Sequence, residues 1–288
     1  VESIKFSAML IFLSMWLLVV YVPVTHWVWG GGILSSWGTM DFAGGIVVHA
    51  TAGTAALVTA LTLGKRRGFP KSITPPHSPI LTMIGASMLW IGWFGFNAGS
   101  ALGANGGAGM AMLVTHISAA TASLVWMFIE WRRFGKPSLI GIVTGMVAGL
   151  ATVTPASGYI GVPGGLILGF FGGLFCYLAV DYIRGKLQID DSLDVFAVHG
   201  VGGILGTLLV AFLATSTFLG LGLAEGQTAV SQFFVQLKAV VLTVVWTSVF
   251  TYLILKITSF IVPLRVGEQE EIEGLDLRSH GEKGYHSD

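Results

Sequence analysis

The chain has 288 residues, of which 53% are hydrophobic and only 10% are charged, and its 15 lysines and arginines balance its 15 aspartates and glutamates. A soluble domain with a polar surface could not be built from so few charged residues, so the composition indicates a protein embedded in a membrane. The zero net charge gives no indication of a nucleic-acid partner, and the single cysteine, Cys176, excludes a disulfide framework and a thiolate metal site.

Eight apolar stretches follow one another along the chain, and each is close to the roughly 20 residues that a helix needs to cross a bilayer core. They lie at residues 4–26, 41–64, 79–101, 106–131, 138–155, 160–184, 192–216 and 230–262. We therefore predict an all-α fold, a polytopic transmembrane helical bundle of eight spans over residues 1–264. A charged tail, residues 265–288, follows the last span.

Among the loops, only alternate ones contain lysine or arginine. Lysines and arginines gather near 65–71, 132–136 and 184–186 and in the tail, whereas the outer loops 27–40, 102–105, 156–159 and 217–229 contain none. Short loops rich in lysine and arginine stay on the cytoplasmic side of a membrane. The pattern therefore predicts eight spans with both ends of this chain in the cytoplasm.

A spaced motif occurs twice. Residues 41–53, DFAGGIVVHATAG, match residues 191–203, DSLDVFAVHGVGG: an aspartate is followed by a histidine eight positions later and by a glycine after four more. By the charge pattern, the helix of His49 enters from outside and that of His199 from the cytoplasm, as in inverted-topology repeats. At about 1.5 Å per residue, each histidine lies about 12 Å into its span. We expect the two histidines to meet near the bilayer midplane.

Ionisable side chains in hydrocarbon are costly and are therefore candidates for function. Imidazole has separate donor and acceptor nitrogens and titrates near neutrality, so His49 and His199 can bind a small N–H solute or relay a proton. Two alternatives stay open: a pair of satisfied core histidines, or ligands of a haem between facing helices. Asp41 and Asp191 stand where helix N-cap acceptors are expected.

The outer side carries an aromatic, glycine-rich stretch. The loop THWVWGGG includes Trp27 and Trp29, and the next outer helix end, WFGFNAGSALG, includes Phe94, Phe96 and Ser100. An aromatic face attracts a monovalent cation by about 0.5–2 kcal/mol, and a hydroxyl can accept a hydrogen bond from it. These residues could select a small cation without a carboxylate. The alternative is an ordinary interfacial aromatic belt.

Along its whole length the chain resembles the Amt/Mep/Rh ammonium transporter family, and the Amt branch in particular. The resemblance rests on HWVWGGG, DFAGGIVVH, GWFGFNAGSA, EWRRFGKPS, VTPASGYIG, DVFAVHGVGGILG and GLDLRSHGE. It implies a homotrimer in the plasma (inner) membrane, with a separate pore in each subunit. It also implies eleven spans in a complete protein, so this sequence is expected to begin at the fourth.

The resemblance assigns roles to single positions. Trp29 and Ser100 would form the external recruitment site for ammonium, supported from behind by Asp41, and Phe96 would be one half of a stacked aromatic gate. The pore would be lined by five residues: His49, His199, Trp93, Leu89 and Val195. Ammonium would lose its proton near Phe96 and cross the apolar lumen as ammonia.

The expected ligands are ammonium and ammonia, with methylammonium as an analogue, and the expected surroundings are a lipid bilayer. We expect no cofactor, no metal, no nucleic acid and no enzymatic activity. The resemblance leaves room for a PII-type signalling protein at the cytoplasmic face. Two other functions stay open, an ammonium sensor or transceptor and a haem-binding membrane redox subunit.

Overall fold

The computed structural model describes residues 3–72 and 75–285, and in these ranges the regular structure is helical apart from one isolated bridge between Ile4 and Arg265. This confirms the all-α prediction. The first half contains α1 (Phe6–Trp16), η1 (Leu17–Tyr21), α2 (Val22–Trp29), α3 (Ile33–Ser36), η2 (Gly45–Ala50), α4 (Thr51–Leu63), α5 (Pro79–Gly99) and α6 (Gly106–Phe134). The second half contains α7 (Leu139–Val153), α8 (Val162–Val180), η3 (Asp181–Lys186), η4 (Phe196–Gly200), α9 (Val201–Leu213), η5 (Ser216–Phe218), α10 (Ala229–Ile261), α11 (Glu268–Glu273) and η6 (Asp276–His280).

Polar side chains mark where several of these helices begin. Ser78, Asn105 and Ser138 each accept a hydrogen bond from a backbone N–H three residues ahead, at the starts of α5, α6 and α7. Thr228 and Ser231 form a capping box at the start of α10. These side chains satisfy N–H groups that have no partner inside the helix, and they separate the apolar runs into distinct elements.

Seven helical segments in the described residues are long and apolar enough to cross a membrane, where the sequence predicted eight spans. The predicted span at 138–155 corresponds to α7, which has 15 residues. The helix ends at Val153 with Thr154 still in the helical conformation, and Pro155 follows, which has no backbone N–H to continue the helical hydrogen bonds. The turn at 154–159 takes up the rest of the predicted stretch.

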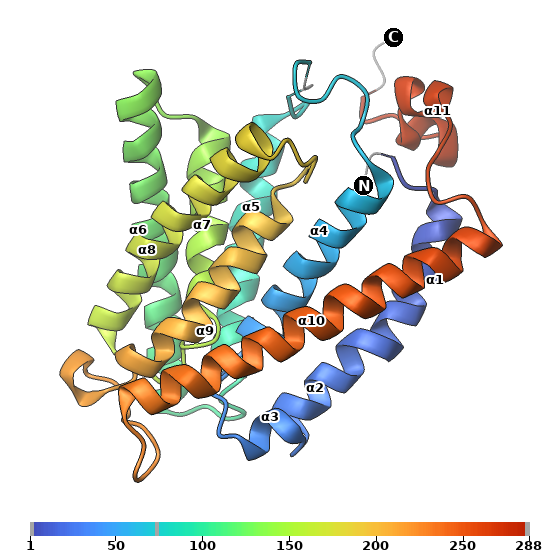
Figure 1. Ribbon diagram of the computed structural model, residues 1–288. Coiled ribbons are helices and arrows are strands. Elements are labelled where there is room, and N and C mark those ends of the chain that lie inside the picture. The colour runs from blue at the N-terminus through green and yellow to red at the C-terminus, as the bar shows by residue number, and fades with distance from the viewer. Residues whose placement is uncertain (1–2, 73–74, 286–288) are drawn as a thin grey trace.

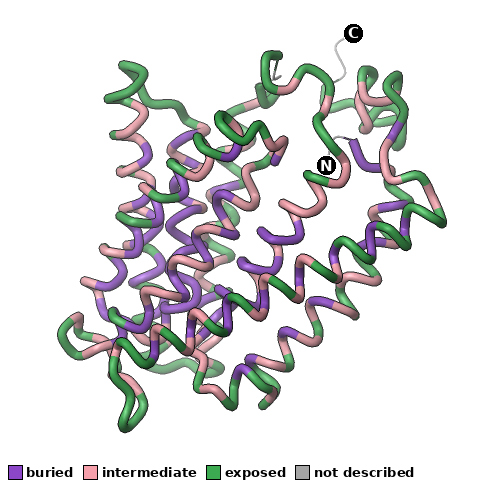
Figure 2. The backbone as a smooth tube through the Cα atoms, in the orientation of Figure 1, coloured by how far each residue is buried: buried purple, intermediate pink, exposed green. Residues whose placement is uncertain are grey.

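The short helix α7 lies inside the bundle, packed against α5, α6, α8 and α9 (Figures 1 and 2). Glycines allow this close packing. Gly149 of α7 and Gly169 of α8 both lie against the backbone oxygen of Ser118 in α6. Small residues let helix backbones approach in this way, so α6, α7 and α8 pack closely together.

The start of the described chain pairs with the segment that follows α10. The backbone N–H of Lys5 donates to Leu264 O (2.8 Å), and that of Val266 donates to Ser3 O (2.9 Å). After this pairing the chain enters α11, at the same end of the bundle as the end of α4 (Figure 1). The residues just before α1 therefore hold the segment that leads into the tail.

The tail is fixed to the end of α4 by charged groups. Arg265 donates to the carbonyl of Leu63 (2.9 Å) and forms an ion pair with Glu271 (2.9 Å). The carboxylate of Glu271 also accepts the backbone N–H of Arg67 (2.7 Å). Burial favours the neutral carboxyl, but these hydrogen bonds and the nearby guanidinium hold the pKa of Glu271 below its usual value.

Candidate functional site

His49 and His199 are in direct contact. Their Nδ1 atoms are 3.1 Å apart and their ring centroids 5.2 Å apart, with an angle of 25° between the rings. A hydrogen bond at this distance requires a proton on one Nδ1 and a lone pair on the other, so one ring donates and the other accepts. His49 is only 2% exposed, and its Nε2 has no hydrogen-bond partner among the described residues.

The separation of the two rings bears on the haem alternative. Metal–nitrogen bonds to imidazole are about 2.0–2.1 Å long, so an ion bound between two facing nitrogens holds them about 4 Å apart. The two Nδ1 atoms are closer than that. The contact is therefore a hydrogen bond between imidazoles, and it does not fit an axial pair around an iron.

Each histidine lies in a π-helical turn that follows a capping aspartate. The carboxylate of Asp41 accepts four backbone N–H groups, from Gly44, Gly45, Ile46 and Val47, at 2.6–3.1 Å. The Asp191 carboxylate accepts from Phe196 (2.7 Å), which is five residues later, as Ile46 is after Asp41. Both aspartates therefore cap helix starts, as the sequence predicted.

Gly44 makes the wide turn before His49 possible. Its φ of 115° lies in the left-handed region, which a residue with a Cβ seldom adopts. From there its carbonyl accepts the N–H groups of both Val48 and His49, each at 2.9 Å. The bond to His49 spans five residues instead of four, which places the imidazole at the widened turn.

The helices of the two histidines run in opposite directions. Beyond the end of α4, Arg66 forms an ion pair with Asp190 (3.2 Å), which directly precedes the second motif. On the other side of the histidines, the start of η2 lies near the middle of α9, because a Cβ on Gly45 would be 2.8 Å from Thr207 Oγ1. The charge pattern had predicted opposite directions for these two segments, and Figure 1 shows this arrangement.

Glycines of the two motifs pack reciprocally. Gly53, four residues after His49, lies against the backbone of Gly200. Gly203, four residues after His199, faces His49: a Cβ there would be 2.6 Å from the His49 Cβ. Each helix therefore has a glycine where the other presents its histidine, and this brings the two rings within hydrogen-bond distance.

Trp93 of α5 covers the histidine pair. Its ring is nearly parallel to both imidazoles, at 5.3 Å from His49 and 6.5 Å from His199, with interplanar angles of 13°. Phe96 lies 5.6 Å from Trp93 and 6.3 Å from His49. The structure therefore brings four of the predicted site residues into one aromatic cluster.

Sequence reasoning did not identify the residues that hold Trp93. Its indole N–H donates to Thr154 Oγ1 (2.9 Å), and Thr154 in turn lies 3.3 Å from the side-chain oxygen of the fully buried Asn97. Asn97 also donates to Thr115 (2.9 Å). Thr154 and Asn97 belong to the motifs VTPASGYIG and GWFGFNAGSA, but nothing in either motif indicates the contact between them.

In the described residues, the side chains of Trp29 and Ser100 make no contact with the rings of this cluster that would add them to it. The indole N–H of Trp29 donates to the carbonyl of Asp41 (2.8 Å), and the ring is 46% exposed. The hydroxyl of Ser100 donates to Phe96 O (2.9 Å). In residues 3–72 and 75–285, no hydrogen bond or ring contact joins Trp29 to Ser100.

The two remaining predicted pore residues make no ring contact with the histidine pair in the described structure. Leu89 lies on α5 one turn before Trp93 and is 56% exposed. Val195 directly precedes η4, the turn that carries His199. Both residues therefore lie close in sequence to site residues, but neither is part of the aromatic cluster.

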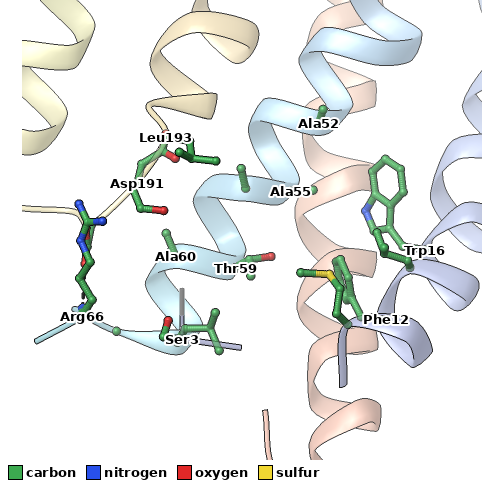
Figure 3. A pocket seen from close by; sticks show the side chains of 17 residues that line it. Ser3, Phe12, Trp16, Ala52, Ala55, Thr59, Ala60, Arg66, Asp191 and Leu193 are labelled. Carbon is green, nitrogen blue, oxygen red and sulfur yellow. Dashed lines mark hydrogen bonds and ion pairs between the residues drawn. The ribbon is translucent and has the colours of Figure 1, made fainter. Parts of the chain in front are cut away.

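A cavity of about 310 Å³ opens between α1, α4 and the start of the second motif (Figure 3). Ala52 and Ala56 of α4 are among the residues that line it. In the motif repeat these two alanines correspond to Gly202 and Gly206 of α9, which pack against Thr152 of α7. At these positions the second copy of the motif thus contacts α7, whereas the first copy borders the cavity.

Comparison with known proteins identifies relatives along the whole chain. A sequence profile of the Ammonium Transporter Family matches residues 1–285. The ammonium transporter Amt1 of Archaeoglobus fulgidus is 47% identical over 287 residues, which are 99% of this chain and 72% of the relative. An ammonium transporter of Aquifex aeolicus is 46% identical over 99% of this chain and 66% of its own length.

The solved structures that superpose on this chain include Amt and Mep proteins. A protein named Sensor Amt Protein superposes with a TM-score of 0.89 at 30% identity, covering 97% of this chain and 71% of that one. Mep2 of Candida albicans superposes with a TM-score of 0.84 at 37% identity, covering 93% and 61%. The chain therefore spans about two thirds of the length of the proteins that it matches.

Proposed function

Because the chain belongs to the ammonium transporter family, we propose that the protein moves ammonium or ammonia across a membrane through a pore centred on His49 and His199. The observation that carries the proposal is the contact between two imidazoles from oppositely directed apolar helices. The family consists of transporters, which agrees with the expectation that the chain is not an enzyme.

The outer recruitment site would use the face of Trp29 and the hydroxyl of Ser100. The indole N–H is already bonded to Asp41 O, so the exposed ring face is the part available to a cation. The Ser100 hydroxyl donates its proton to Phe96 O, which leaves its oxygen lone pairs free to accept an N–H from ammonium. Asp41 holds the tryptophan through its backbone and does not touch the ion.

Proton loss would follow from desolvation. A bare monovalent ion in a low-dielectric lumen is costly by many kcal/mol, whereas neutral ammonia needs only a hydrogen-bond partner. His49 Nε2, buried and unpartnered in the described structure, could supply that partner beyond Phe96. Potassium is excluded in this scheme because it has no proton to give up.

The same proposal extends to the architecture. The opposite directions and reciprocal glycine packing of α4 and α9 support an inverted repeat with α7 as the eighth span. In such a repeat, the cavity beside Ala52 and Ala56 is the place for a helix equivalent to α7. We also propose a homotrimer in the plasma (inner) membrane with a cytoplasmic tail, and contact with a PII-type protein at that face.

A sensor is the second candidate function. It is favoured by the similarity to a solved structure named Sensor Amt Protein and by the attachment of the tail to the end of the His49 helix through Arg265 and Glu271. A sensor with the same site would still bind ammonium, so the two functions differ in whether labelled substrate crosses the membrane.

The test is uptake of labelled methylammonium by liposomes that contain the intact protein, with potassium as competitor. The variant in which both His49 and His199 are replaced by leucine should lose more than about tenfold in rate, because the lumen then offers ammonia no hydrogen-bond partner. His116→Leu is the matched control, since this histidine of α6 stacks on Trp90 instead. Unchanged rate and selectivity in the double variant would contradict the proposal.

A further inference from the structure

Gln236 of α10 is a fully buried amide whose hydrogen-bonding groups are all used. Its Nε2 donates to the carbonyls of Met40 (2.7 Å) and Thr207 (2.9 Å). Its Oε1 accepts the backbone N–H of Met40 (2.8 Å) and the side-chain N–H of Gln232 (3.2 Å). One side chain thus binds both backbone groups of a single loop residue and also the helix that carries His199.

The loop residue is the one before Asp41. The carboxylate of Asp41 caps the turn of His49, and its carbonyl accepts the indole N–H of Trp29. By fixing the peptide groups on both sides of Met40, Gln236 determines where Asp41 and its carbonyl lie. The bond to Thr207 ties this same point to the middle of α9.

A second glutamine extends the contact along the loop. Gln232, one helical turn before Gln236, donates to the carbonyl of Gly38 (3.0 Å). The segment 38–40 is therefore held to α10 by two side-chain amides in place of regular secondary structure. Elsewhere on α10, the buried hydroxyls of Thr243 and Thr247 have no partner in the described residues, so not every buried polar group on this helix is tied to a loop.

We propose that Gln236 is a positioning residue for substrate recruitment: through Met40 and Asp41 it fixes the orientation of the Trp29 ring. The inference rests on the proposed function, because it gives Gln236 a role only if Trp29 receives the cation. It predicts that loss of the amide lowers substrate affinity more than it lowers the rate of translocation, since the His49–His199 contact does not involve Gln236.

The experiment compares Gln236→Met, which keeps an unbranched side chain of similar length, with the intact wild-type protein in liposomes. The apparent KM for methylammonium should rise about tenfold, the effect expected from loss of about one hydrogen bond to a positioned group. The maximal rate per folded protein should change by less than about twofold. Thr243→Val, which removes an unpartnered buried hydroxyl from the same helix, should leave KM and maximal rate as in the wild type.

Folded protein is quantified by size-exclusion chromatography of the detergent extract. If Gln236→Met does not fold, the test is made with Gln232→Met. This variant removes only the bond to Gly38 and one bond to Gln236. It should also raise KM, by a smaller factor. An unchanged KM in the folded variant, or a fall in maximal rate alone, overturns the positioning role. Wild-type liposomes that take up no methylammonium would instead refute the proposed function.

Discussion

Gly53 of α4 lies against the backbone of Gly200, the residue that follows His199. No side chain fits between the two helices at this point, and the Nδ1 atoms of the histidine pair are 3.1 Å apart. The distance between the imidazoles therefore depends on two glycines, which have no reactive side chain.

Gly53→Val should abolish transport while both histidines remain. The added side chain would overlap the Gly200 backbone, so α4 and α9 would have to move apart and the bond between the rings would break. We expect a loss of more than about tenfold in methylammonium uptake, together with a lower unfolding temperature typical of overpacking by about 1–3 kcal/mol. Gly85→Val on α5, where a Cβ meets no atom within 4 Å, is the control.

Thr154→Val should loosen Trp93 above the histidine pair. The substitution keeps the shape of the side chain but removes the acceptor of the indole N–H, a loss of about 1 kcal/mol or a several-fold change in rate. Methylammonium uptake and the tryptophan emission spectrum measure the effect. Thr154→Ser retains the hydroxyl and should restore both; equal loss in the valine and serine variants would argue that packing matters and the hydrogen bond does not.

Asp41→Asn should destabilise the fold strongly. The carboxylate accepts four N–H groups, and an amide would turn its NH₂ group toward some of these donors. Leaving buried donors unpaired costs about 1–3 kcal/mol each, so thermal unfolding in detergent should occur at a clearly lower temperature. Asp276→Asn in the exposed η6 is the control, and an unfolding temperature equal to that of the wild type would show that the cap contributes nothing.

Attachment of α11 to the end of α4 should depend on pH in the acidic range. The pKa of Glu271 is lower in the folded protein than in the free side chain, so its stabilising effect is complete above the ordinary value of 4.5 and is lost as pH falls through the folded value. Protease cleavage of the tail should therefore increase below about pH 4.5 in the wild type, and at neutral pH already in Glu271→Gln. Glu268→Gln, at the start of α11, should leave tail cleavage at the wild-type level.

The sequence predicted the parts of the fold that repeat or alternate. Apolar stretches indicated the helices, and the equal spacing in residues 41–53 and 191–203 indicated that His49 and His199 would meet. The span at 138–155 was predicted too long, because hydropathy continues past Val153 whereas the helix stops before Pro155. Composition measures how apolar a stretch is, and it does not show where backbone geometry ends a helix.

Contacts between distant residues could not be predicted. Trp93 and Thr154 are 61 residues apart, and Met40 and Gln236 are 196 apart, so no local pattern links them. A buried glutamine in an apolar helix has no visible partner in the sequence until the helix is packed. The functional roles of all the predicted site residues stay predictions, because they concern an ion in transit.

The widened turns at 45–50 and 196–200 limit how this molecule can change by insertion or deletion. A π-helical turn holds one residue more than an ordinary helical turn, so removing one residue from either segment would convert it to an ordinary turn and shorten the spacing between the aspartate and the histidine. The cap or the close helix contact would then be lost, since both depend on that spacing. We therefore expect a deletion in either turn to disturb this packing, and a change of length to be accommodated in the loops outside them.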